Sequence, residues 1–188
     1  MIDRKKQILD VAAELLQARS YTSFSYQDIS DRLGITKATI HSHFRTKEIL
    51  GVTLIDCYRA GAKTILDNIS YEHPNPWDRF DAFVKSMFQM SLADDKICPI
   101  GALQSEYKVI PARMQERVGH LYGFLIGWLA DTLKIGRDKG YMAFTGSPED
   151  QAALILAALQ GALQNARAEG HLIFTTVVNQ IKRVMMVL

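Results

Sequence analysis

The sequence predicts an all-α protein of about nine helices. Apolar residues recur at helical spacing, as in the stripe that contains Ile8, Val11 and Leu15. All five prolines fall between such stripes, and no segment alternates apolar and polar residues as a half-buried strand would. With 188 residues, of which 48% are hydrophobic and 22% charged, the chain has the composition and the length to bury a core of its own.

Helix boundaries in the first part of the chain are marked by capping residues. Ser25 and Asp28 form a capping-box pattern, which predicts that a helix begins after Ser25. Gly34 predicts the end of that helix, because glycine tolerates the left-handed conformation found there. Thr36 and Thr46 are positioned to cap the two helices that follow. After a first helix with the stripe around Ile8, we therefore expect helices over 26–33, 37–44 and 47–68.

The rest of the chain shows the same kind of boundaries. Apolar residues from Phe80 to Phe88 predict one helix, and Pro99 marks a break before the next. Ser147, Pro148 and two acidic residues form a strong helix start, since serine caps and proline suits the first helical position. The longest helices of this part are expected over 112–138, 148–170 and 171–188.

Composition and motifs limit the class of function. The two cysteines are too few for a disulfide framework or a four-thiolate zinc site, and the five histidines are scattered, so we expect no metal and no cofactor. Phosphate loops, nucleophile elbows and zinc-protease motifs are absent from the sequence, which argues against an enzyme. No leader pattern or bilayer-length apolar segment is present, so a cytoplasmic protein without membrane contact is expected.

The segment from Ser25 to Lys47 carries the most specific signal. Two short helices joined by a glycine-containing turn form a helix-turn-helix. In the second of them, only Ile40 and Phe44 are bulky and apolar, and the other residues are small or polar with no acid. Such a surface suits a DNA groove, where carboxylates would repel phosphate. The first 50 residues carry eight Lys or Arg and six Asp or Glu, so the net charge of +2 lies in this part of the chain.

These residues are similar to a known family of regulators. The family resemblance rests on the Ser25–Ser30 segment, on the Gly34–Ile40 segment, and on Phe44 and Lys47. Together they resemble the N-terminal DNA-binding domain of the TetR family of bacterial transcriptional regulators. The resemblance implies a helix-turn-helix domain over residues 1–46 and a larger helical ligand-binding and dimerisation domain over residues 47–188. It also implies a homodimer on a palindromic DNA operator, and a repressor that a ligand releases.

The resemblance assigns a DNA-binding role to residues of the helix-turn-helix. Tyr26 and Ser25 would offer hydroxyl and backbone N–H groups to a phosphate, and Lys47 would do so with a full charge. His41 stands where the family usually has a tyrosine that touches the DNA backbone. It is either a titratable contact or an exposed polar residue without a role. The implied set is Ser25, Tyr26, Gln27, Thr36, Lys37, Ala38, Thr39, His41, His43 and Lys47.

The regulatory part carries weaker signals for an effector and for a dimer. Aromatic, methionine and polar side chains favour a hydrophobic or amphipathic effector, although such stripes also form ordinary cores. The candidate effector residues are Tyr58, Met87, Phe88, Cys98, Leu103, Tyr107, Tyr122, Trp128, Gln160 and Gln164. Small and apolar residues of the last two helices suit a four-helix interface between two chains, unless they pack only within one chain. The candidate interface residues are Ala153, Ala157, Gly161, Phe174, Val177, Val178, Ile181 and Met185.

Two alternatives stay open at this point. Cys98 lies in a Cys-Pro-x-Gly stretch similar to one found in a branch of the family, in which some relatives sense electrophiles or oxidants through a cysteine. Such a thiol needs a lowered pKa and access to solvent, whereas a buried Cys98 would be a small core residue. The other alternative is a helical dimeric adaptor that keeps the fold and binds no DNA. It would have no reason to keep the acid-free surface of residues 37–43.

Overall fold

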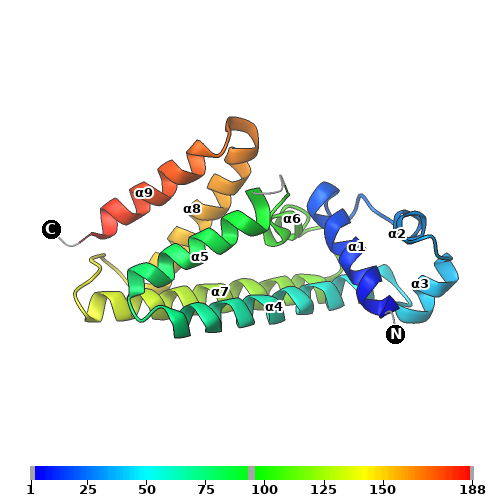
Figure 1. Ribbon diagram of the computed structural model, residues 1–188, viewed down its shortest axis with the longest axis horizontal. Coiled ribbons are helices and arrows are strands. Elements are labelled where there is room, and N and C mark those ends of the chain that lie inside the picture. The colour runs from blue at the N-terminus through cyan, green and yellow to red at the C-terminus, as the bar shows by residue number, and fades with distance from the viewer. Residues whose placement is uncertain (1–2, 93–95, 187–188) are drawn as a thin grey trace. The chain divides into compact units, whose positions relative to one another are not determined.

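The computed structural model describes residues 3–92 and 96–186, and it confirms the all-α fold class (Figure 1). Within these residues the chain forms nine α-helices. They are α1 (Arg4–Arg19), α2 (Tyr26–Leu33), α3 (Lys37–His43), α4 (Lys47–Glu72), α5 (Pro76–Ser91), α6 (Pro99–Ser105), α7 (Ala112–Asp138), α8 (Pro148–Glu169) and α9 (Leu172–Met185).

The helix starts predicted at Thr46 and Ser147 are confirmed, because their hydroxyls accept from the N–H groups of Ile49 and Asp150. Asp3 and Asn75, which were not predicted, cap α1 and α5. Helices α3 and α8 each end one residue before the predicted end, and the larger differences are in α4 and α9. Helix α4 extends to Glu72 rather than residue 68, because Ile69 is buried and its turn has a core to pack against. Helix α9 ends at Met185, and residues 187–188 of the predicted last helix lie outside the described residues.

The chain folds into two compact units, each made of two separate stretches of the sequence. The first unit comprises Met1–Gly61 together with Pro99–Leu121, and the second comprises Ala62–Cys98 together with Tyr122–Leu188. The division therefore falls inside α4 and inside α7. Helix α6, which lies far from α1 in sequence, belongs to the same unit as α1, α2 and α3.

A clamp of two opposite charges holds the loop between α1 and α2. The half-buried ammonium of Lys47 donates to the backbone carbonyls of Tyr21 and Phe24. Its Nζ also lies 4.3 Å from the centre of the Tyr21 ring and 4.4 Å from that of Phe24, which is cation–π distance. Burial lowers the pKa of Lys47 below its usual value, and the nearby Glu106 carboxylate opposes this effect.

Glu106, which follows α6, holds the same loop from its N–H side. One carboxylate oxygen accepts from the Tyr21 N–H at 2.7 Å, and both accept from the Thr22 N–H at 3.2 Å. The Thr22 hydroxyl donates to this carboxylate as well. Tyr21 thus has its N–H bound by an anion and its carbonyl bound by a cation. We call Lys47 and Glu106, with the loop of residues 20–25, the loop clamp.

The second unit is built around apolar faces of α5, α7, α8 and α9. Phe80, Leu129, Leu133 and Leu159 are buried almost completely. The Phe88 ring of α5 lies 5.9 Å from the ring of Phe174 of α9. A short backbone pairing between Ala143 and Met185 ties the loop after α7 to the end of α9.

The loop clamp predicts an effect on stability. Lys47→Met keeps an apolar stem over the two rings but removes the donor to two carbonyls, so we expect it to lower the free energy of unfolding by about 2 kcal/mol. Urea unfolding followed by circular dichroism measures this loss. Lys63→Met serves as control, because Lys63 is exposed and pairs only with Asp67. Equal stabilities of the two variants would contradict the role of the clamp.

Tyr26 predicts a dependence of stability on alkaline pH. Its buried hydroxyl donates to the Phe44 carbonyl at 2.8 Å, and burial raises its pKa to about 12. In the unfolded chain a tyrosine ionises near pH 10, so this stabilisation is complete below about pH 10 and is lost as the pH rises towards about 12. Tyr26→Phe should cost about 1 kcal/mol at neutral pH, and its difference from the parent should shrink at high pH.

Urea unfolding at about pH 8 and about pH 11 measures the change that Tyr26→Phe makes. Tyr71→Phe is the control, because the Tyr71 side chain is 90% exposed and should show no difference at either pH. A constant difference between Tyr26→Phe and the parent across this range would refute the prediction.

Candidate nucleic-acid interface

Helices α2 and α3 are fixed by local signals that the sequence predicted. Ser25 accepts from the Gln27 N–H, while the Asp28 carboxylate accepts from the Ser25 N–H at 2.8 Å, which completes the capping box. Hydrogen bonding to Ser25 lowers the pKa of Asp28. Gly34 ends α2 with φ of 62°, a conformation that suits glycine, and Thr36 caps α3 by accepting from the Thr39 N–H. The two helices are thus joined by a turn of defined geometry.

Helix α3 presents a polar surface without acidic residues. Ile40 is fully buried and Phe44, its C-cap, is nearly so, which anchors the helix in the first unit. Lys37, Ala38, His41, Ser42 and His43 are exposed. Lys37 and His43 have no side-chain partner among the described residues, so their donors are available to another molecule. This combination is what a helix entering a DNA groove requires.

Other residues of the predicted set, of which Gln27, Thr36 and Ser25 are exposed and Thr39 is half-buried, already make hydrogen bonds within the chain. The Gln27 amide donates to Asp31 at 2.7 Å, so contact with DNA would require it to change partner. The hydroxyls of Thr36 and Thr39 lie 3.0 Å apart at the start of α3. Ser25 is exposed beside the N-terminus of α2. Arg45, which was not predicted, is an exposed cation that directly follows α3 and its cap.

Two of the predicted phosphate contacts are corrected by the structure. The Tyr26 hydroxyl is buried and donates to the Phe44 carbonyl, so it is not free for a phosphate. The Lys47 ammonium is held in the loop clamp, so its charge supports the fold of the first unit rather than an open phosphate site. Both residues instead support the helix-turn-helix through hydrogen bonds to backbone carbonyls. A motif shows which residue types recur, but it does not show which of them turn inward.

The sequence analysis left open whether His41 contacts DNA or is an exposed residue without a role, and the structure shows features of both. Its ring is exposed, yet Nδ1 lies 3.2 Å from the Arg45 carbonyl. The ring also meets the Tyr26 ring edge-on at 4.9 Å. His41 therefore helps to hold the end of α3 against α2 and still faces outward.

The predicted effector residues are divided between the two units. Tyr58, Leu103 and Tyr107 belong to the first unit and the other predicted residues to the second. Cys98 and Gln160 meet, because the Gln160 amide donates to the Cys98 sulfur at 3.4 Å. The Cys98 side chain is only 6% exposed, which disfavours a sensor thiol that must be reached from solvent. The exposed cysteine is Cys57.

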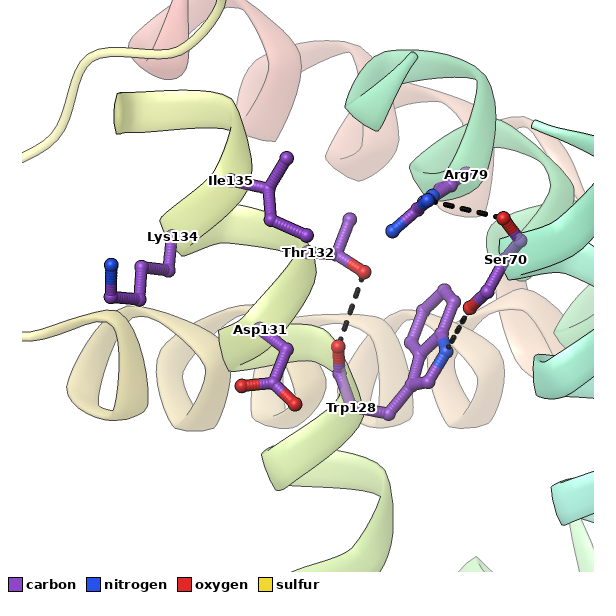
Figure 2. Close-up of a pocket in the computed structure, with 7 residues that line it drawn as sticks. All are labelled: Ser70, Arg79, Trp128, Asp131, Thr132, Lys134 and Ile135. Carbon is purple, nitrogen blue, oxygen red and sulfur yellow. Dashed lines mark hydrogen bonds between the residues drawn. The ribbon is translucent and has the colours of Figure 1, made fainter. Parts of the chain in front are cut away.

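A cavity of the second unit includes one predicted effector residue, Trp128. It lies between the end of α4, the start of α5 and the last turns of α7, and it has a volume of about 340 Å³ (Figure 2). Arg79, which was missed by the sequence analysis, also lines it. A sequence signal for Arg79 existed, because no acidic residue stands three or four positions away to neutralise its charge.

The predicted interface residues divide into two groups. Phe174, Ile181 and Met185 are buried within their own chain, as the alternative of packing inside one chain requires. Val177, Val178 and Ala153 are half-buried. Ala157 and Gly161 are exposed, and they share one face of α8 with Leu154 and Gln164. Leu154 was not predicted, although its side chain is 63% exposed.

Among residues 3–92 and 96–186, no group of three or more His, Cys, Asp or Glu side chains could hold a metal ion. None of the helices in the same residues is both long and apolar enough to cross a bilayer.

Comparison with known proteins agrees with this geometry. Residues 8–50 match the family described as bacterial regulatory proteins, tetR family. The HTH-type transcriptional repressor NemR of Escherichia coli (strain K12) is 22% identical over 168 residues, which cover 88% of this chain and 84% of that protein. A TetR-family transcriptional regulator from Agrobacterium tumefaciens has a similar structure, with a TM-score of 0.93, 28% identity and 97% of each chain covered.

A TetR transcriptional regulator from Legionella pneumophila is similar too, with a TM-score of 0.90, 26% identity and 98% of each chain covered. The match over 8–50 includes the capped helices α2 and α3, and the structural likeness extends over almost the whole chain. These relatives are regulators rather than enzymes. The acid-free surface of α3 on its helix-turn-helix, taken with these matches, shows that the chain is a DNA-binding transcriptional regulator that is similar to those of the tetR family.

Proposed function

We propose that this regulator is a repressor that binds a palindromic operator as a homodimer and is released by a small hydrophobic or amphipathic effector. The observation that carries the proposal is the exposed surface of α3, which has donors without partners and no carboxylate. Regulators of the tetR family bind operators and effectors, typically as dimers, and the relative NemR is named a repressor. The proposed site of action is the cytoplasm, and we infer no catalytic activity.

The proposed DNA contacts divide by chemistry. Lys37 and Thr39, at the start of α3, are suited to base edges in the major groove, because the Lys37 side chain is exposed and Thr39 is half-buried beside it with a hydroxyl that can accept or donate. Arg45 and the N-terminus of α2 at Ser25 are suited to phosphates, which position the protein but carry little sequence information. Ala38, exposed and small, leaves room for close approach or for contact with a thymine methyl group.

Release is proposed to act by a shift between two conformational populations. An effector that binds one spacing of the two recognition helices more tightly favours that spacing and weakens operator binding by the same coupling energy. Helix α4 is the proposed connection, because its first part belongs to the unit that contains α3 and its last part belongs to the other unit.

The proposed dimer interface uses the exposed face of α8. Leu154, Ala157, Gly161 and Gln164 recur at three- and four-residue spacing, so one side of the helix offers small and apolar contacts. An isologous interface would place this face of α8 against a second copy, which is the symmetry that a palindromic operator matches.

DNA binding is tested with fragments that flank the gene and with a pool of random sequences. We expect one sequence class to bind tightly, with affinity that falls steeply between about 50 mM and about 200 mM salt. Lys37→Ala and Thr39→Ala should each weaken this binding by roughly 5- to 100-fold. Lys63→Ala is the control, since Lys63 is an exposed cation far from α3 in sequence. Failure to enrich any sequence from the pool would contradict specific recognition.

The dimer is tested by changing its proposed apolar contact. Leu154→Glu places a charge on the exposed face of α8 without touching the core, so we expect the parent to sediment as a dimer and the variant as a monomer. Tyr71→Glu, at another strongly exposed position, should stay dimeric. If Leu154→Glu sediments like the parent, the interface lies elsewhere.

A further inference from the structure

The cavity between α4, α5 and α7 contains a cation whose charge no carboxylate balances. The Arg79 Nε–H donates to the His73 carbonyl at 2.7 Å, and Nη2 donates to the Ser70 carbonyl at 3.1 Å. Both acceptors are neutral backbone groups near the end of α4. Among the ion pairs of the described residues none involves Arg79, so its positive charge faces the cavity without an anionic partner.

Three of the five N–H donors of Arg79 have no acceptor in the described part of the chain. The two bonds to α4 fix the plane of the guanidinium, and Figure 2 shows it extending from α5 towards Thr132 and Trp128. A half-buried guanidinium with fixed orientation and open donors is suited to bind a carboxylate in a bidentate manner.

Beside this cation the cavity has a rigid apolar wall. The Trp128 indole N–H donates to the Ser70 hydroxyl at 2.9 Å, and the ring packs against Phe83 with 5.4 Å between centroids. Ile135 adds a second apolar surface. The Thr132 hydroxyl is buried and donates to the Trp128 carbonyl at 3.1 Å. The wall therefore suits the flat or aliphatic body of a small molecule.

Charges at the edge of the cavity limit the charge of such a molecule. Asp131 lines the cavity, is exposed, and has no ion-pair partner among the described residues. Lys134 is bound to Asp138, so its charge is largely compensated. The Asp131 carboxylate repels any anion in the cavity, so a single negative charge bound to Arg79 is favoured over two charges.

We propose that this cavity binds a small organic monocarboxylate, with the carboxylate on Arg79 and the apolar body against Trp128 and Ile135. A volume of about 340 Å³ lies in the range of sites for small ligands. That this molecule is the effector rests on the proposed function. The binding site itself rests only on the second unit, so the two statements can be tested separately.

The test uses benzoate, phenylacetate and hexanoate as probes, each with its neutral amide. The full chain has two tryptophans, so ¹H–¹⁵N spectra give two indole signals, and Trp77→Phe assigns them. We expect at least one carboxylate to shift the Trp128 signal with saturation, and its amide to leave the signal in place. If no carboxylate saturates the signal, or if the amides bind equally well, the proposal is wrong.

Two variants separate binding from folding. Arg79→Gln should weaken the carboxylate by roughly tenfold or more, but Arg79 also holds the end of α4. Asp131→Asn avoids this problem, because it removes only an exposed repelling charge, and it should strengthen binding by roughly threefold. Glu169→Gln, an exposed acid of α8 that does not line the cavity, should change nothing. Unchanged affinity in Asp131→Asn would overturn the placement of the ligand.

The role as effector is read from a separate measurement on the operator complex. Release of DNA by the bound carboxylate, lost in Arg79→Gln, supports the assignment as effector. Carboxylate binding without release of DNA rejects that assignment while the site stands. If the parent binds no operator at all, the proposed function fails, and the spectra of the free protein still decide the carboxylate site.

Discussion

The peptide groups around Tyr21 are held between two opposite charges, and the geometry of the first unit depends on this arrangement. Lys47 binds the carbonyl side and Glu106 binds the amide side, although the two residues are far apart in sequence. Backbone N–H and C=O groups removed from water need hydrogen-bond partners, and the loop between α1 and α2 obtains them from these two side chains. The orientation of α2 relative to α1, and through α2 that of α3, therefore depends on side chains from outside the helix-turn-helix.

Local sequence signals were sufficient for most of the helices and for the surface of α3. Ser25, Gly34 and Thr36 act on neighbours within four residues, so their effect is visible in the sequence. The partners of Lys47 were not visible, because its role depends on where Tyr21, Phe24 and Glu106 meet in space. The same limit explains why α6 was expected in the larger domain while its contacts place it with α1.

The regulatory part was harder to predict for a related reason. Periodicity shows which face of a helix is apolar, but it does not show whether that face is covered by the same chain or by another one. Phe174 and Met185 are covered within the chain, whereas Leu154 is not. The candidate ligand site was hidden as well, since Arg79 and Trp128 lie on different helices and each looks ordinary in its own segment. Both form a hydrogen bond with Ser70, which neither segment alone could reveal.

The discontinuous first unit has a consequence for module exchange in regulators of this kind. A hybrid sensor made by joining residues 1–46 to a foreign regulatory part would separate the loop of residues 20–25 from the carboxylate of Glu106 and from Lys47. The transplanted residues 1–46 would then contain the N–H groups of Tyr21 and Thr22 and the carbonyls of Tyr21 and Phe24 without their hydrogen-bond partners. A hybrid that keeps the first unit intact must carry residues 1–61 together with residues 99–121. Recombination points should therefore follow the boundaries of compact units rather than the order of motifs along the gene.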